Sequence, residues 1–286
     1  MASLKTIRKR IGSVKSTQQI TKAMKMVAAA KLRRAQEAAH AARPYAEKLA
    51  EMLRTVAARA GDVNHPLLAT RESERTIDLI VITSDRGLCG GFNANILRAA
   101  EAFLRERPGV TARVTAVGNK GFAYFRKRPI GVAEHHTHFQ AGPDHALAVQ
   151  LAARVARDFA EGATDGVYVL YSQFRSALSQ VPTIEQLLPV QRPAGDTQEL
   201  VDYIYEPDAL TLLDRLLRQY ITTEIDHAFL ESIASEHAAR MTAMENATSN
   251  AGDMIDRLTL AMNRARQAAI TTELMEIVSG AEALKG

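Results

Sequence analysis

The residues best suited to chemistry follow one apolar segment in the middle of the chain. A glycine-rich stretch over 83–93, Thr-Ser-Asp-Arg-Gly-Leu-Cys-Gly-Gly-Phe-Asn, lies between a predicted strand and a predicted helix. Such a loop can hold a phosphate group at a helix N-terminus. It lacks the Gly-Lys-Ser/Thr ending of a nucleotide P-loop and the Gly-x-Gly-x-x-Gly of a dinucleotide site. We therefore favour a tight structural turn that presents Arg86 and Cys89 to a partner over a phosphate site.

The single cysteine and a histidine cluster offer two further kinds of site. Cys89 could act as a nucleophile only beside a positioned general base, and no motif around it supplies one. A surface or packing thiol is the simpler interpretation. His135, His136 and His138 resemble a metal cluster, but alternate residues of a strand point to opposite faces, and no further ligand lies at a zinc spacing. An exposed strand or loop is favoured there, and we predict no catalytic residue, metal or cofactor.

Strands and helices alternate through the centre of the chain. The first strand, over 76–83, is almost continuously apolar, which is typical of a strand buried on both faces. Alternation at this spacing predicts a small α/β domain with a mainly parallel, Rossmann-like sheet. The other strands are predicted over 113–117, 167–171 and, at an edge, 183–190, and the helices over 93–104, 119–127 and 144–159.

The first 60 residues predict a long helix. Small and apolar residues recur there in steps of three and four, which places them on one helical stripe. The stripe consists of Ile7, Ile11, Val14, Gln18, Thr21, Met24 and Ala28. The helix should run to about Arg34, kink or break briefly at Pro44, and end at Gly61.

The last 79 residues, 208–286, contain no proline and predict a second long helix. Heptad spacing from Met241 to Thr272 indicates left-handed coiled-coil packing. A helix over 208–284 would be roughly 115 Å long, so part of it must project from a domain of this size. Its core positions are mostly Ala, Thr and Met, which bury little apolar area, so the projecting part should depend on a partner. We expect domains over 1–60, 70–206 and 207–286.

Charge is distributed unevenly along the chain. The formal net charge is only +4, but residues 2–58 carry 13 basic and 3 acidic side chains, whereas 209–286 carry 7 basic and 11 acidic ones. Two such helices side by side would partly neutralise each other, and the surplus positive charge would face an acidic partner. One cysteine excludes an internal disulfide and fits a reducing compartment. No apolar run of about 18 residues is available to span a membrane.

Several strings along the chain resemble the gamma subunit family of F-type ATP synthases. They are Ile-Thr-Lys-Ala-Met-Lys-Met-Val-Ala-Ala at 20–29, Ser-Asp-Arg-Gly-Leu-Cys-Gly-Gly at 84–91, and Arg-Gln-Ala-Ala-Ile-Thr-Thr-Glu-Leu at 266–274 followed by Glu-Ile-Val-Ser-Gly. Segments 203–208 and 235–241 also look like family signatures. The resemblance covers essentially the whole chain in order, except that 105–165 carries no signature.

The resemblance implies a non-catalytic rotor shaft. The terminal helices would form an antiparallel coiled coil inside a ring of alpha and beta subunits, and the α/β domain would lie beside the epsilon subunit and the membrane ring of c subunits. Proton-driven rotation of the c ring would then be coupled to conformational change at the beta-subunit sites that synthesise ATP. The complex would be peripheral, on the cytoplasmic face of a bacterial inner membrane.

The resemblance also implies which residues contact those partners. Met24 and Lys25 are similar to residues that face the beta lever region, and Arg86 and Cys89 to a further contact. The residues that look like contacts to the loops of the ring are Arg240, Arg266, Gln267, Thr271 and Glu273. Tyr203, Tyr205 and Glu206 are similar to the part of the gamma subunit that meets the c ring, which we call the foot.

Two alternatives compete with this interpretation. A coiled-coil adaptor could bind nucleic acid through the basic N-terminal helix, although no aromatic platform interleaves its Lys and Arg side chains. Such binding would weaken steeply with salt. An enzyme built on the α/β domain would need a phosphate loop that the sequence lacks, so we predict negligible affinity of the chain itself for nucleotides.

Overall fold

In the order of the chain, the strands of a sheet come between two very long helices. The computed structural model describes residues 4–59, 65–71, 73–137, 144–191 and 208–283. The first helix is α1 (Leu4–Arg59) and the last is α5 (Ala209–Ala283). The chain packs as two compact units, one formed by 1–27 with 241–286 and the other by 28–240. Both helices contribute to both units, and each unit is described in turn.

The long helices form as their hydrophobic patterns predicted, with one difference. α1 continues through Pro44 over its 56 residues, so the brief break that we considered there is wrong. Proline lacks the N–H that would bond the His40 carbonyl, but a single missing bond does not end a helix that is otherwise packed. α5 is 75 residues long and carries no proline.

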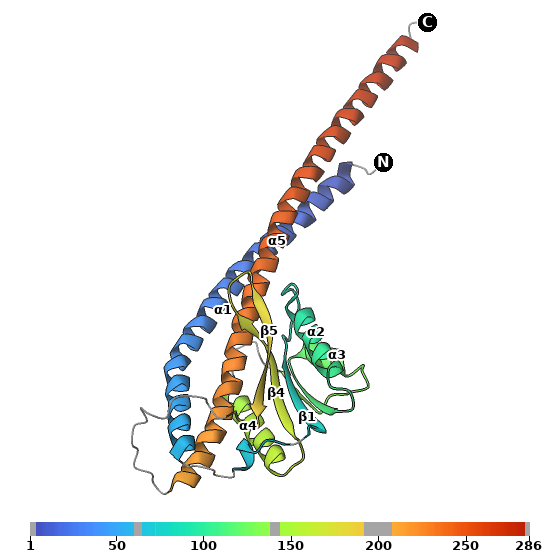
Figure 1. The fold of residues 1–286 in the computed structure, drawn as a ribbon. Helices are drawn as coiled ribbons and strands as arrows, with labels where there is room; N and C mark the ends of the chain where they lie inside the picture. The colour runs from blue at the N-terminus through green and yellow to red at the C-terminus, as the bar shows by residue number, and fades with distance from the viewer. Residues whose placement is uncertain (1–3, 60–64, 72, 138–143, 192–207, 284–286) are drawn as a thin grey trace. The chain divides into compact units, whose positions relative to one another are not determined.

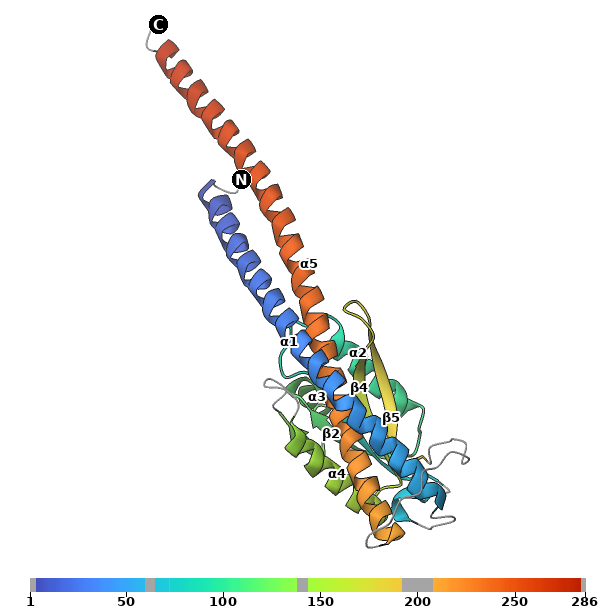
Figure 2. The same ribbon diagram turned by 90° about the vertical axis from the view of Figure 1, so that its left-hand side faces the viewer.

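In the first unit, the beginning of α1 and the end of α5 lie side by side and run antiparallel (Figures 1 and 2). The predicted stripe of α1 faces the partner helix, since Ile7 and Thr21 are buried. On α5 the heptad residues Met244 and Ala251 are buried at 5% and 7% exposure. The predicted antiparallel coiled coil is therefore confirmed.

The end of α5 extends beyond the start of α1 (Figure 1). Every side chain from 270 to 281 is exposed. This stretch is nevertheless rich in large apolar residues, namely Ile270, Leu274, Met275, Ile277 and Val278. Clustered apolar exposure of this kind is typical of a surface used for binding.

The second unit contains a five-stranded sheet in the order β3-β2-β1-β4-β5. The first four strands are parallel and β5 pairs antiparallel with β4. The strands are β1 (Thr76–Ile82), β2 (Thr111–Val117), β3 (Glu134–His136), β4 (Gly166–Phe174) and β5 (Gln180–Leu188). This arrangement confirms the predicted mainly parallel α/β domain with an edge strand at its end.

Helices cover both faces of the sheet. Ile77, Leu79 and Val81 of β1 pack in one cluster with α2 (Phe92–Arg105) and with Phe125 of α3 (Asn119–Phe125). On the opposite face lies α4 (His145–Ala160) (Figure 1). Burial on both faces explains the near-continuous apolar sequence of β1, and a short 3-10 helix, η1 (Pro66–Leu68), precedes the strand.

The sheet contains one buried ion pair and one strand that the sequence did not define. Asp78 of β1 is completely buried and accepts two hydrogen bonds from Arg113, at 2.7 and 2.5 Å. His135 and His136 belong to the edge strand β3, where both are half-buried rather than fully exposed. His135 stacks on Phe122 with ring centroids 4.0 Å apart. His138 lies outside the described residues.

Candidate functional site

The glycine-rich loop follows the carboxyl end of β1 and is closed by its own side chains. The Ser84 backbone N–H donates to the Asn93 amide oxygen at 3.0 Å, and the Ser84 hydroxyl donates to the Arg86 carbonyl at 2.6 Å. Asn93 also donates to the Cys89 sulfur at 3.2 Å. These bonds fix the loop as the tight structural turn that the sequence favoured.

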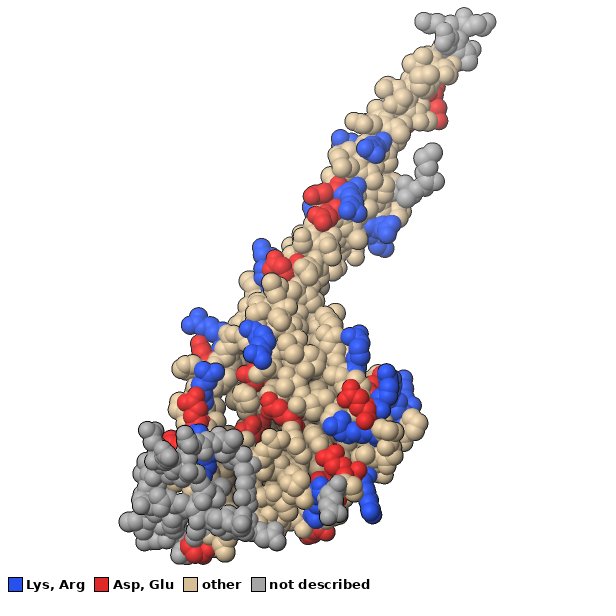
Figure 3. All heavy atoms as spheres, viewed as in Figure 1, with Lys and Arg blue, Asp and Glu red and all other residues tan. Residues whose placement is uncertain are grey.

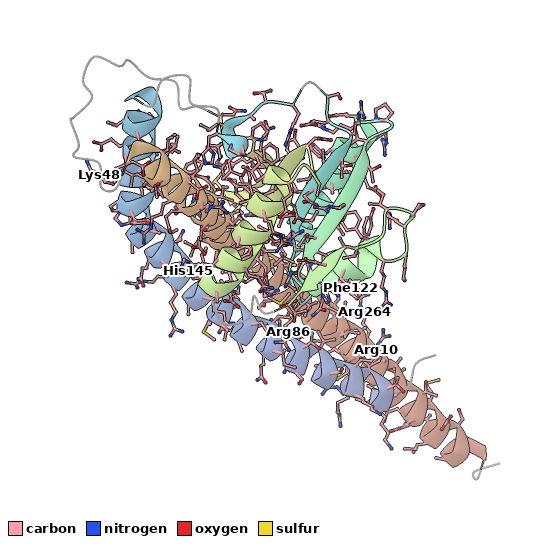
Figure 4. The ribbon with its side chains drawn as sticks, turned by 90° about the horizontal axis from the view of Figure 1, so that it is seen from below. Arg10, Lys48, Arg86, Phe122, His145 and Arg264 are labelled. Carbon is pink, nitrogen blue, oxygen red and sulfur yellow. The ribbon has the colours of Figure 1, made fainter. Side chains whose placement is uncertain are left out.

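The loop buries its thiol and exposes its neighbours. Cys89 is only 1% exposed, and burial raises the pKa of its thiol, which suits a packing residue and not a nucleophile. Cys89 is thus packed inside the loop, and its contact with a partner stays a prediction. Arg86, which Figure 4 labels, is exposed. Leu88 is 64% exposed with a φ of 64°, a backbone region that leucine rarely adopts.

Helix α5 closes the space beside this loop. Arg240 donates to the Gly87 carbonyl at 3.3 Å and pairs with Glu236 at 2.7 Å. It also lies 3.3 Å from the Nδ1 atom of His237, which can accept a hydrogen bond from it. The side chains of Arg240 and Glu236 are only 12% and 10% exposed. We call Glu236, His237 and Arg240, together with Gly87 of the loop, the α5 latch.

Burial controls the protonation of the latch. Desolvation raises the pKa of Glu236, although the neighbouring Arg240 opposes that shift. Desolvation, followed by the positive charges of Arg240 and Lys31, lowers the pKa of His237 to about 4. His237 is therefore neutral at pH 7 and can accept the hydrogen bond from Arg240.

The latch stands where many α/β domains bind a ligand. Parallel sheets take up ligands beyond the carboxyl ends of their strands, at the point where the strand order reverses. Here that point lies between β1 and β4, because β2 follows on one side of β1 and β4 on the other. Ala239 of α5 packs in the same core cluster as the apolar residues of β1. The neighbouring Arg240 donates a hydrogen bond to the Gly87 carbonyl of the loop. The chain thus fills this position with its own helix.

A cavity of about 680 Å³ lies elsewhere in the same unit, between α1, α5 and the β4–β5 hairpin. Its wall includes His145, which Figure 4 labels on α4 and which bonds Asp226 at 2.6 Å. Burial raises the pKa values of Asp226 and Glu224. Within the described ranges, no three His, Cys, Asp or Glu side chains come together as metal ligands.

The structure places the other predicted contact residues in two groups. Met24 and Lys25 are half-buried in the paired helices, and Lys25 forms an ion pair with Glu245. The second group consists of predicted contact residues that are exposed near the end of α5, namely Arg266, Gln267, Thr271 and Glu273. The predicted foot, Tyr203, Tyr205 and Glu206, lies outside the described residues.

Sequence reasoning missed part of the arrangement around the loop. Among the predicted contact residues that the structure describes, Arg86, Cys89 and Arg240 are the ones that belong to this loop and to the helix residue bonded to it. Segment 235–241, which resembles a family signature, contains both Glu236 and His237, but no spacing rule indicates that they pack beside the loop.

The charged surface shows no continuous basic patch on the face drawn in Figure 3, where acidic side chains stand among the Lys and Arg of the paired helices. Among the described helices, none is both long enough and apolar enough to cross a membrane.

Comparisons with known proteins place the chain in one family. The family model described as ATP synthase matches residues 3–284. The ATP synthase gamma chain of Geobacter sp. (strain M21) is 52% identical over 289 residues, and that of Pelotomaculum thermopropionicum is 50% identical over 286, each match covering 100% of both chains.

Solved structures agree with these relatives. The central stalk and c-ring structure of the Tetrahymena thermophila mitochondrial ATP synthase contains a chain that is 27% identical, with a TM-score of 0.61, covering 80% of this chain and 99% of its own. A chain of the Euglena gracilis mitochondrial ATP synthase is 21% identical with a TM-score of 0.68, over 98% and 94%, and it shows the fold. The chain described here belongs to the ATP synthase gamma chain family.

Proposed function

We propose that this protein is the central rotor shaft of an F-type ATP synthase. The observation that carries the proposal is full-length membership of the gamma chain family, together with a helix pair whose free end is exposed and apolar. In this role it couples rotation of the c ring, driven by protons, to conformational change at the beta-subunit sites. Its partners are the alpha and beta subunits, the epsilon subunit and the c ring.

The described geometry suits a shaft that acts through contact. Long paired helices resist bending, and the seam of small residues keeps the pair narrow. A rotating shaft changes a catalytic site only if it contacts the alternative states of that site differently. Moving a two-state site from 1:99 to 99:1 takes about 5.5 kcal/mol of such differential contact. Many modest contacts along an exposed helix can together supply that amount.

We assign the ring contacts to two surfaces. One is the exposed end of α5, including Arg266, Gln267, Thr271 and Glu273. The other is the exposed part of the glycine-rich loop, Arg86 with Leu88. Arg240 acts there as a positioning residue, since its guanidinium holds the Gly87 carbonyl and is only 12% exposed.

The remaining assignments follow from the rotor role. Nucleotide chemistry takes place on the beta subunits, so this chain is non-catalytic, and the space beside its glycine-rich loop is filled by α5. Tyr203, Tyr205 and Glu206 form the foot on the c ring. The complex is peripheral, on the cytoplasmic face of a bacterial inner membrane, and the basic side chains of α1 serve protein contacts in place of nucleic-acid binding.

Reconstitution tests the proposal directly. Purified alpha and beta subunits are assembled with and without this chain, and ATP hydrolysis is measured. We expect steady hydrolysis that depends on the chain and is lost when α5 is truncated before residue 260. The rotor role would be contradicted if the hexamer of alpha and beta subunits hydrolysed ATP equally well without this chain. It would also be contradicted if the chain bound DNA with a steep salt dependence and did not bind the hexamer.

A further inference from the structure

The seam between the paired helices does not by itself define how they align. The heptad positions of α5 are mostly Ala, Met and Thr, and small or flexible side chains of this kind pack against a neighbouring helix almost equally well after one helix slides by a turn. In coiled coils, alignment of this kind is commonly specified by a polar residue at one core position. The first unit contains such a feature.

Three polar side chains form a layer across the seam. The hydroxyl oxygens of Thr21 and Thr248 are 2.7 Å apart, and the Gln18 amide donates to the Thr248 carbonyl at 3.4 Å. Thr248 also bonds the Met244 carbonyl at 2.7 Å. The Thr21 hydroxyl also lies 3.0 Å from the Gln18 carbonyl of its own helix. When Thr248 donates to the Met244 carbonyl, Thr21 can donate across the seam to Thr248 in place of that carbonyl. Thr21 is only 8% exposed, so this layer lies inside the pair.

Gly252 shapes the layer from the α5 side. A Cβ atom at this position would lie 3.3 Å from the Gln18 amide nitrogen, closer than most side-chain contacts. The missing side chain leaves room for the Gln18 amide to reach across the seam. The glycine, which weakens a helix interior by up to about 1 kcal/mol relative to alanine, therefore has a local packing reason.

An ion pair lies one turn away on the same seam. Lys25 of α1 pairs with Glu245 of α5, and their side chains are 39% and 54% exposed. Sliding either helix by one turn would separate these charges and would move the buried Thr21 hydroxyl away from Thr248. The Gln18 amide would lose the Thr248 carbonyl as well, and the two hydroxyls would keep only the carbonyls of their own helices. Sliding would therefore remove the polar contacts that join the two helices.

We propose that Gln18, Thr21 and Thr248, together with the Lys25–Glu245 pair, set the alignment of the two helices, and that Lys25 acts inside the shaft as a positioning residue. The layer admits one alignment of the seam and opposes sliding when torque is applied to the pair. Its importance for coupling rests on the proposed rotor function, whereas the alignment itself does not.

Disulfide trapping in the assembled complex measures the alignment. Continuing the antiparallel pattern of the layer places Val14 opposite Ile255, and sliding by one turn places Val14 opposite Leu258. The pair Val14→Cys/Ile255→Cys therefore reports the observed alignment, and Val14→Cys/Leu258→Cys reports the displaced one. The native Cys89 is buried and remains in both.

Removal of the two hydroxyls with Thr21→Val/Thr248→Val should reduce the ratio of the observed to the displaced cross-link by about tenfold, which corresponds to the loss of roughly one hydrogen bond. Thr21→Ser/Thr248→Ser keeps the hydroxyls and should preserve the ratio. An unchanged ratio in the valine variant would overturn the role of the layer.

Charge exchange tests the ion pair separately. Lys25→Glu and Glu245→Lys should each lower the cross-link ratio, and the double exchange should restore it. Lys22→Glu makes the same charge change at an exposed position of α1 and serves as the matched control. If the double exchange fails to restore the ratio, Lys25 does not act through Glu245.

Coupling is then measured in sealed vesicles as protons pumped per ATP hydrolysed. The variants that lose alignment should pump fewer protons per ATP at unchanged complex yield, and the double exchange should recover them. If the rotor role were wrong, ATP hydrolysis by the hexamer would not require this chain, while the cross-link ratios of the variants would still change as expected. Normal pumping in a misaligned variant would refute the need for this layer in coupling.

Discussion

Protonation of His237 should loosen the α5 latch as the pH falls. The folded chain holds this imidazole neutral, because burial and the nearby cations Arg240 and Lys31 lower its pKa from 6.5 to about 4. In the unfolded chain the side chain regains its ordinary pKa. Between these two values the unfolded state binds the extra proton and the folded state does not, so stability decreases as the pH drops through this window.

The size of the effect follows from the two pKa values. Between pH 7.5 and 5.5, His237 alone should cost about 1.3 kcal/mol of folding free energy, rising toward roughly 3 kcal/mol below pH 4. Glu236 acts in the opposite direction, since its pKa is raised by burial and its protonation at lower pH favours the folded state. The two contributions partly cancel in the wild-type chain, so the comparison must be made against a variant that lacks only the imidazole.

We would measure urea unfolding of the purified chain and of His237→Gln at pH 7.5, 6.5 and 5.5. A glutamine can still accept from Arg240, so the variant should be similar to wild type at pH 7.5, where His237 is neutral. At pH 5.5 it should be more stable than wild type, because it lacks the wild-type loss of about 1.3 kcal/mol on acidification. His40→Gln, at an exposed position of α1, is the matched control and should keep that loss. Equal pH dependence in wild type and His237→Gln would refute the buried neutral imidazole.

Three further predictions address the latch, the backbone and the shaft. Arg240→Met should destabilise the chain by about 3 kcal/mol at pH 7.5, because Glu236 is left charged in a buried site, and the loss should shrink at lower pH as that carboxylate protonates. Gly118→Ala should severely destabilise the chain in thermal unfolding, because the φ of 101° at this position suits glycine and a Cβ atom would collide with the Thr83 carbonyl. Gly12→Ala is the control: a Cβ atom there meets open space, so the change should stabilise α1 by about 0.5–1 kcal/mol. Arg266→Ala should leave unfolding of the purified chain within about 0.5 kcal/mol of wild type while it lowers ATP hydrolysis by the reconstituted complex; the reverse pattern would place this side chain inside the fold.

The local elements were largely predictable because their signals are periodic. The apolar run of β1 and the heptads of α5 each depend on residues close in sequence, and both elements have nearly the predicted bounds. β3 escaped prediction because a strand of three residues has too few positions to show a period. Pro44 misled the prediction of α1 because local rules do not include the packing that holds a long helix together.

The latch was not predictable in the same way. Arg86 and Arg240 are 154 positions apart and come together only through the topology of the sheet. Whether Cys89 is buried likewise depends on how Ser84 and Asn93 fold the loop inward. The resemblance to a family indicated which segments matter, but it could not distinguish a side chain that contacts a partner from one that holds such a side chain in place.

The decrease of burial along α5 shows why alignment matters most near Thr248. Met244 and Ala251 are buried, Ile255 and Leu258 are half-buried, and residues 270–281 are fully available to a partner. Helix formation is cooperative, so the exposed end can continue as helix from the paired part without contacts of its own. Its orientation, however, is inherited from that paired part. Each residue of displacement turns a helix by about 100° and advances it by about 1.5 Å, so a seam misaligned by one residue would present a different face at Arg266. Directional hydrogen bonds at the polar layer provide an alignment that the non-directional apolar contacts of the seam cannot.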